Sequence, residues 1–289
     1  SLDGIQEGYI EASSAGMCSI TLIKKINYIS SKDNSYKLSV KGFIGGHSGD
    51  DIDKNRCNAI KLIIKILNEL NYCKIISFDI GKRDNVIPSE GYILFSSKYN
   101  LDVIRNKIEN MDLSSENFNY DIEEIRKNQT IQESEEIIKF INTIKNGLLE
   151  TYKDDGFPIL SSNIGRVSIE DDKVIIKYSI RSSDELAFKY GFEFIIDARK
   201  PFFPFKEKSR IREILAKSYK ELYGTETIIK KVHACMECGI LSKNIKDLDI
   251  CTIAPTIENC HSINEKVSIS STNRVYEWLK RTLTEYNKM

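Results

Sequence analysis

The segment KGFIGGHSGD (41–50), followed by NAIKLIIKILNEL (58–70), decides the fold that we expect. The first segment ends an alternating strand that begins at Tyr36, and its glycines form a tight turn that presents a single histidine, His47. The second segment has apolar residues at helical spacing and predicts an amphipathic helix. Two further strands, expected at 74–80 and 91–96, complete an α+β unit.

A second block of the same kind follows. The segment ESEEIIKFINTIKNGLLETY (133–152) has helical periodicity and carries acidic residues in its first turn, where the helix dipole favours them. Strands are expected around 164–169 and 173–180. Each block combines a helix, a turn that contains an asparagine (Asn85 or Asn163) and a strand pair. This order predicts a duplicated α+β unit.

The proline-containing segment RKPFFPF (199–205) interrupts the pattern and predicts a domain boundary just before it. A helix over 209–223, a strand over 248–253 and a helix over about 272–286 are expected after it. Alternating helices and strands indicate an α/β layer in this last part of the chain.

Composition limits the classes of protein that the chain can belong to. Its 289 residues suggest two domains, at roughly 150 residues each. The 42 basic and 42 acidic side chains balance, which argues against a nucleic-acid partner. No apolar stretch reaches the length of a membrane span, and seven cysteines in a chain of this size are typical of reduced thiols in a cytoplasmic protein.

All three histidines, His47, His233 and His261, lie in expected loops, where catalytic groups concentrate. Beside His233, the thiols of Cys235 and Cys238 have a spacing that can share one zinc ion, but a structural zinc needs four ligands and no second pair has suitable spacing. Buried thiols in a tight turn are the simpler interpretation. The glycine-rich turn at His47 lacks the ending of a phosphate-binding loop.

Four short motifs carry a resemblance to a known family: LDG with EG (2–8), KGFIGGHSGD (41–50), RDNVIP (83–88), and HACMECG (233–239) with APTI (254–257) and HS (261–262). In this order they resemble the aminoacyl-histidine dipeptidases, a branch of the zinc aminoacylase and carboxypeptidase superfamily. The resemblance implies a catalytic domain that binds two metal ions, usually zinc, and an inserted lid domain that closes over the substrate and mediates homodimerisation.

The resemblance also implies a division of the chain. Residues 1–16 correspond to the end of an N-terminal catalytic segment, and residues 199–289 to the C-terminal part of the α/β catalytic domain. Residues 17–198 correspond to the lid, expected as a duplicated ferredoxin-like sheet with helices on one face and with repeats at about 36–110 and 133–198.

The family's functional residues map onto particular positions here. Asp3 and His261 resemble metal ligands, a carboxylate and an imidazole that both suit zinc. His47 resembles the lid histidine that stabilises the oxyanion at the scissile carbonyl, in the same subunit or across a dimer. Arg181 resembles the lid arginine that binds the C-terminal carboxylate of the substrate. Three further residues are candidate substrate contacts: Asn163, Asn85 and Glu237.

The family's His-x-Asp motif, its bridging aspartate and its Glu-Glu pair have no counterpart in the 289 residues. We therefore expect this chain to be a shortened form of a dipeptidase that cleaves Xaa-His dipeptides, inactive by itself and unable to hold both zinc ions fully. A non-catalytic dimerisation or binding module is one alternative. A related peptidase or acylase that acts on another substrate, such as a tripeptide or an acylated amino acid, is the other.

Overall fold

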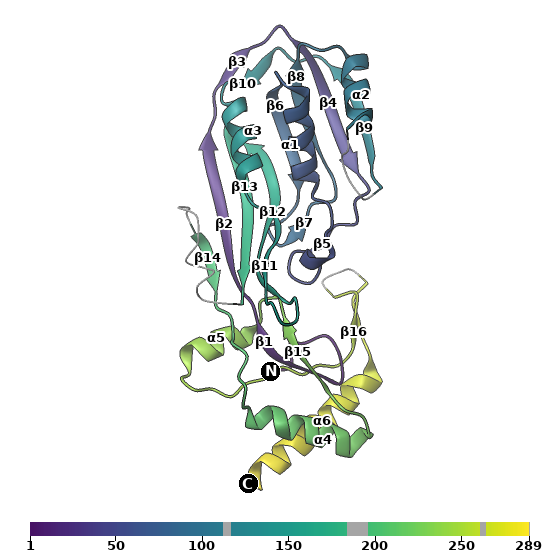
Figure 1. Cartoon of the computed structure of the whole chain (residues 1–289), viewed down its shortest axis with the longest axis vertical. Coiled ribbons are helices and arrows are strands. Elements are labelled where there is room, and N and C mark those ends of the chain that lie inside the picture. Colours follow the sequence, from purple (N-terminus) through teal and green to yellow (C-terminus); the bar gives the residue numbers. More distant parts are fainter. Residues whose placement is uncertain (112–116, 184–195, 261–263, 289) are drawn as a thin grey trace.

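The structure of the chain, a computed structural model, describes residues 1–111, 117–183, 196–260 and 264–288. It consists of two units (Figure 1). Residues 16–200 form the sheet unit, which is built on one large β-sheet, whereas residues 1–14 and 201–288 together form the base unit, which contains both ends of the chain. No helix in the described ranges is long and apolar enough to span a membrane.

Nine strands form the sheet of the sheet unit, and each is antiparallel to its neighbours. Their order is β14-β2-β13-β12-β6-β8-β4-β9, and β11 pairs with the first half of β12. The strands are Gly16–Lys25 (β2), Asn34–Lys41 (β4), Lys74–Gly81 (β6), Gly91–Ser97 (β8), Asn119–Ile125 (β9), Gly147–Thr151 (β11), Pro158–Glu170 (β12), Lys173–Ser182 (β13) and Ile196–Lys200 (β14).

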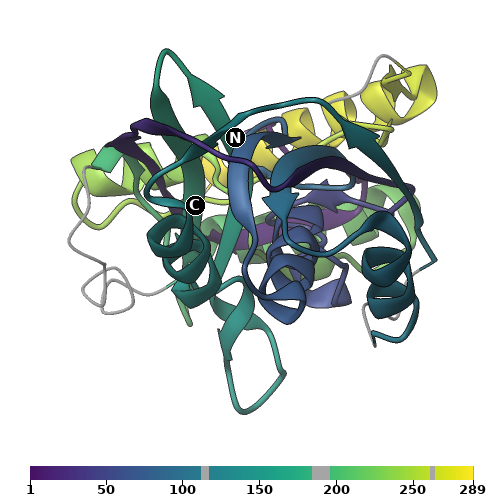
Figure 2. The same cartoon turned by 90° about the horizontal axis from the view of Figure 1, so that it is seen from above.

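Among the described residues, three helices cover one face of this sheet (Figures 1 and 2): Ala59–Leu70 (α1), Leu101–Glu109 (α2) and Ser134–Thr143 (α3). Helix α1 begins where the sequence predicts, because the Asn58 side chain accepts hydrogen bonds from the backbone N–H groups of Ile60 and Lys61. The apolar stripe of α1 packs onto the sheet in a continuous core that includes the fully buried Phe78 and Phe95. Burial of this stripe is the main stabilisation of the helix.

The sheet is a duplication in which one repeat is inserted into the other. The elements β4, α1, β6, β8, α2 and β9 follow each other along the chain and give the strand order β9-β4-β8-β6. Strands β2, β12, β13 and β14, with α3, give the equivalent order β14-β2-β13-β12, and the repeats join where β6 pairs with β12. The expected fold class, a duplicated ferredoxin-like sheet with helices on one face, is confirmed. The expected repeats omitted β2 and β9, because alternation identifies a strand but not its neighbours.

Two local predictions were wrong. The helix expected over 133–152 ends at Thr143, and the chain continues as β11, which pairs with β12. Gly147 has a backbone φ of 99°, a conformation that an α-helix does not contain. In the described residues, the strand expected over 248–253 is reduced to one bridge, in which Thr252 and Glu11 exchange backbone hydrogen bonds of 2.8 and 3.0 Å.

The base unit is smaller. Its strand Tyr9–Ser14 (β1) is parallel to Ile228–Val232 (β15) and leads after one residue into β2, so extended chain connects the two units. Helices Arg210–Tyr223 (α4) and Ile269–Asn287 (α6) pack on the face of β1 that carries Ile10, around the buried Trp278.

The remaining elements of both units, within the described residues, are Glu237–Asn244 (α5), Tyr28–Ser30 (β3), Gly46–His47 (β5), Val86–Ile87 (β7), Gln129–Ile131 (β10), Ile257–Glu258 (β16), Lys266–Val267 (β17) and a 3-10 turn at Ile52–Lys54.

Candidate functional site

The glycine-rich turn holds His47 in a defined position. Its short strand β5 pairs with β7, so that His47 lies opposite Val86. The carboxylate of Asp51 accepts a 2.8 Å hydrogen bond from the His47 backbone N–H and forms an ion pair with Arg56 at 2.9 Å. Gly46 has a φ of 132°, and a Cβ there would lie within 2.4 Å of the Asp51 carboxylate, so only glycine fits.

The side chain of His47 lies between an acid and an arginine. Its Nδ1 is 3.1 Å from Asp50 Oδ2, and its Nε2 is 3.4 Å from Arg181 Nη2. Because a guanidinium only donates, Nε2 is the acceptor in this contact, and the Asp50 backbone N–H points at Nδ1 from 3.3 Å. The hydrogen bond from His47 lowers the pKa of the Asp50 carboxyl, which therefore stays ionised.

Arg181 is the most deeply buried charge of this group. It lies near the end of β13, is only 3% exposed, and donates through Nε to the Ser48 hydroxyl at 3.4 Å. Burial lowers the pKa of Arg181, and the negative charges of Asp50 and Asp84 act in the opposite direction. Such a desolvated guanidinium is suited to a planar, bidentate anion such as a carboxylate.

Asn163 and the turn around Asn85 hold the backbone next to His47 in place. The Asn163 side chain donates two 2.8 Å hydrogen bonds, to the carbonyl oxygens of Asp84 and Val86. The carbonyl of Asn85 accepts a hydrogen bond from the Ser48 backbone N–H at 3.0 Å. Asn163 therefore fixes the turn that pairs with the His47 strand.

His233 connects the base unit to the same centre. Its ring Nε2 is 2.8 Å from the hydroxyl of Ser161 on β12, and both side chains are buried. Burial, together with the positive charge of Arg181, lowers the pKa of His233 to about 4. The ring is therefore neutral at physiological pH.

Glu11, on β1, is a buried carboxylate that was not among the expected site residues. Its oxygen Oε2 is buried without a hydrogen-bond partner in the described part of the chain, and it lies against the bare Cα of Gly4. Burial raises the pKa of Glu11 to about 7, with Lys230 opposing and with Asp50 and Asp3 adding to the rise. Glu11 is thus within electrostatic reach of Asp50, beside His47, and of Asp3.

The remaining expected residues lie near the N-terminus or outside the described residues. Asp3 and Glu237 are exposed and meet at Ser1: the Ser1 hydroxyl accepts a hydrogen bond from the Asp3 backbone N–H and donates one to the Glu237 carboxylate. His261 lies outside the described residues.

The residues present do not fit a metal site. In the described ranges, no three His, Cys, Asp or Glu side chains are grouped so that they could hold an ion. Cys238 is buried, and its Sγ lies 3.2 Å from the Thr252 hydroxyl, whereas Cys235 is only half-buried.

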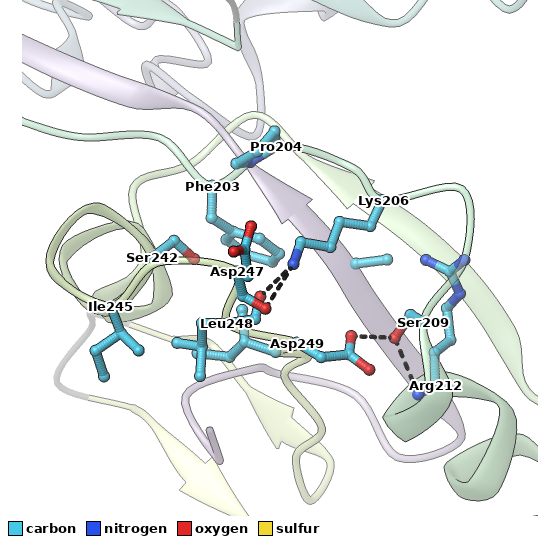
Figure 3. A pocket seen from close by; sticks show the side chains of 12 residues that line it. Phe203, Pro204, Lys206, Ser209, Arg212, Ser242, Ile245, Asp247, Leu248 and Asp249 are labelled. Atoms are coloured by element: carbon cyan, nitrogen blue, oxygen red, sulfur yellow. Dashed lines mark hydrogen bonds between the residues drawn. The ribbon is translucent and has the colours of Figure 1, made fainter.

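A cavity of about 190 Å³ in the base unit is separate from this centre (Figure 3). Several of its polar groups are paired with each other. Lys206 donates to the carbonyls of Asp247 and Leu248 at 3.1 and 2.7 Å, and Asp249 accepts from the Ser209 hydroxyl at 2.6 Å. These bonds hold the start of α4, and we assign the cavity no ligand.

Sequence reasoning thus named four residues that the structure brings together: His47, Arg181, Asn163 and the Asn85 turn. It did not identify the contacts of Ser48, Asp50, Ser161 or Glu11. Ser48 and Asp50 adjoin His47 in the glycine-rich turn, and Glu11 is the one charged residue in the strand Tyr9–Ser14, so these three could have been noticed. Ser161 carries no such signal.

Comparison with known proteins supports the relationship that the motifs indicated. No protein-family model matches the chain. The cytosol non-specific dipeptidase of Escherichia coli K12 is 26% identical over 283 aligned residues, which cover 87% of this chain and 58% of that protein. The crystal structure of aminoacylhistidine dipeptidase from Vibrio alginolyticus matches with a TM-score of 0.80 and 25% identity, over 99% of this chain and 64% of that one. This chain therefore spans about three-fifths of the length of these two relatives. The chain is thus homologous to these two dipeptidases and shares the fold of the second over nearly all of its own length.

Proposed function

We propose that this chain provides the lid and the carboxylate-binding centre of a metal-dependent dipeptidase that hydrolyses Xaa-His dipeptides. The observation that carries the proposal is the buried Arg181 guanidinium beside His47, 3.4 Å away, in the sheet unit of a chain whose relatives are named dipeptidases. A dipeptide has one free carboxylate close to its only peptide bond. An arginine and a histidine in contact can therefore address both groups at once.

In this proposal Arg181 binds the C-terminal carboxylate of the peptide. The carboxylate replaces His47 Nε2 as acceptor for the guanidinium and offsets the cost of burying that charge. Released from Arg181, the His47 ring in the tautomer that carries its proton on Nε2 donates to the oxygen of the scissile carbonyl, while Nδ1 accepts from the Asp50 backbone N–H at 3.3 Å. Asn163 and the Asn85 turn hold His47 in place through the pairing of β5 with β7.

The complete enzyme would use two divalent ions, zinc or another metal, to activate the attacking water. Asp3 and His261 remain proposed ligands, and Glu237 a proposed substrate contact. Because the described residues do not form a metal site, we derive no catalytic step through the ions. The division into residues 1–16, 17–198 and 199–289, homodimerisation through the lid and a cytoplasmic location belong to the same proposal. The E. coli relative is named for the cytosol, which supports the last point.

Calorimetry with alanyl-histidine and with its C-terminal amide tests the proposal on the purified chain. We expect the dipeptide to bind at least about tenfold more tightly than the amide, because the amide lacks the charge that Arg181 binds. Equal binding of the two ligands, or of neither, would contradict a carboxylate centre. A parallel assay with added zinc or manganese measures turnover, and light scattering measures the proposed dimer.

A further inference from the structure

The structure assigns to His233 the role of a positioning residue that holds Arg181 and His47 at the junction of the two units. The assignment rests on the proposed function of these two residues. It concerns how the base unit, which contains neither of them, fixes the distance between them.

The first contact is made by the ring of His233. Its Nε2 lies 2.8 Å from Ser161 Oγ, and the edge of the ring faces Phe157, with ring centroids 6.2 Å apart. Ser161 is the direct register partner of Arg181, since β12 and β13 pair at these two residues. A displacement of Ser161 therefore moves the backbone that carries Arg181.

The second contact is made by the backbone of His233. The bare Cα of Gly49 lies against the His233 carbonyl, and a Cβ on Gly49 would be only 2.7 Å from that oxygen. Gly49 follows Ser48, whose hydroxyl accepts a hydrogen bond from Arg181. One residue of the base unit thus touches both the His47 turn and the strand next to Arg181.

The contact between His233 and Ser161 is stronger than an exposed contact between the two units, because both of its side chains are buried. His233 and Ser161 are 5% and 1% exposed, so neither group can exchange its partner for water without opening the junction. The ion pair between Lys231 and Asp155, at 2.7 Å, connects the same two units, but both side chains are about a third to a half exposed. Exposed ion pairs contribute little.

The ring must be neutral to do this. Arg181 lies close enough for its charge to lower the pKa of His233, and a charged imidazolium would repel the guanidinium that it positions. The backbone carbonyl of Pro158 acts in the opposite direction and raises the pKa of the ring. The neutral ring shares one hydrogen bond with the Ser161 hydroxyl through Nε2, and its donor follows the tautomer of the ring.

Four variants of the full chain test the role. His233→Leu removes the hydrogen bond and keeps an apolar side chain of moderate size, whereas His233→Gln places an amide near the former Nε2. Ser161→Ala removes the partner with little change in volume. Ser96→Ala is the matched control, a buried serine in the same sheet whose hydroxyl has no partner among the described residues.

We expect the Arg181 Nε–H signal, assigned by its loss in Arg181→Lys, to shift in His233→Leu and Ser161→Ala but not in His233→Gln or Ser96→Ala. Binding of alanyl-histidine should weaken by about 5- to 30-fold in the first two variants, the cost of one buried hydrogen bond. An unchanged arginine signal in folded His233→Leu and Ser161→Ala would overturn the assignment. If the wild-type chain does not bind the dipeptide, the proposed function fails, while the arginine signal still decides the role of His233.

Discussion

Arg181 and His47 are 134 positions apart in sequence, yet the Nη2 of Arg181 lies 3.4 Å from the Nε2 of His47. The two residues belong to different repeats of the duplicated sheet: the His47 turn follows β4 of the inserted repeat, whereas Arg181 lies on β13 of the outer repeat. Strands β6 and β12, which pair at Val167 and Ile80, join the repeats into one sheet. The candidate binding centre is therefore a product of the duplication, since neither repeat contains it alone.

Arg181→Met should separate binding from stability. Removing the guanidinium should weaken binding of alanyl-histidine by about 2–5 kcal/mol, the range for loss of a buried charged partner. The free energy of unfolding should stay unchanged or rise, because a buried charge without a full counter-charge costs desolvation energy that methionine does not. Calorimetry and urea unfolding measure the two quantities. A strongly destabilised variant would instead show that Arg181 serves the fold.

Asn163→Asp should loosen the turn beneath His47. The amide donates to the carbonyls of Asp84 and Val86, and an ionised carboxylate would set negative charge against both oxygens. We expect a loss of about 2–4 kcal/mol in unfolding free energy at pH 7. Burial against two acceptors raises the pKa of the introduced carboxyl, so the loss should shrink as the pH falls and the group becomes protonated. Urea titrations at pH 5 and pH 7 compare the two conditions, and an equal loss at both would contradict the mechanism.

Local sequence signals predicted some elements well and failed where distant strands decide the structure. Helix α1 follows its pattern because its cap, Asn58, and its apolar stripe both lie within the segment. The helix expected over 133–152 was longer than α3 is. The apolar residues after Ile144 suit a strand as well as a helix, and pairing with β12 selects the strand. Pairing decides β2 as well, which precedes the inserted repeat and completes the outer one.

The same distinction applies to the site. His47 could be named because it lies in a motif that resembles the dipeptidases, and Arg181 because its position resembles that of the lid arginine in the same family. The contact of Ser161 with His233 could not be named, since serine is common in strands and its partner lies 72 residues away. The buried state of Glu11 also depends on Gly4 and on the segment around Ala254, which only the folded chain brings together.

Gly165→Ala should disturb the centre without touching it directly. A Cβ at Gly165 would lie 2.0 Å from the Arg83 carbonyl and 2.5 Å from the Asp84 Cα, where β12 is irregular between Ile164 and Arg166. The turn that includes Asn85 must then move away from β12 and release the strand that pairs with His47. We expect about 2 kcal/mol or more of destabilisation and a shift of the His47 ring signals in NMR spectra. Gly224→Ala, with open space around its Cα, is the control for those ring signals.

Glu11→Gln should abolish a specific pH dependence of stability. Burial raises the pKa of Glu11 from 4.5 to about 7, so between these values the folded chain binds more protons than the unfolded chain. Stability from this group is full below pH 4.5 and is lost as the pH rises through 7, by up to about 1.4 kcal/mol per pH unit. Glu11→Gln should therefore be more stable than the wild type at pH 8, by about 2–3 kcal/mol, and similar to it at pH 4. Urea unfolding at half-unit pH steps measures both profiles.

The control is Asp155→Asn. The hydrogen bond from Lys231 lowers the pKa of the Asp155 carboxyl, so loss of this carboxyl changes the pH dependence of stability with the opposite sign. A Glu11→Gln profile parallel to that of the wild type would show that the carboxylate stays ionised in the folded chain.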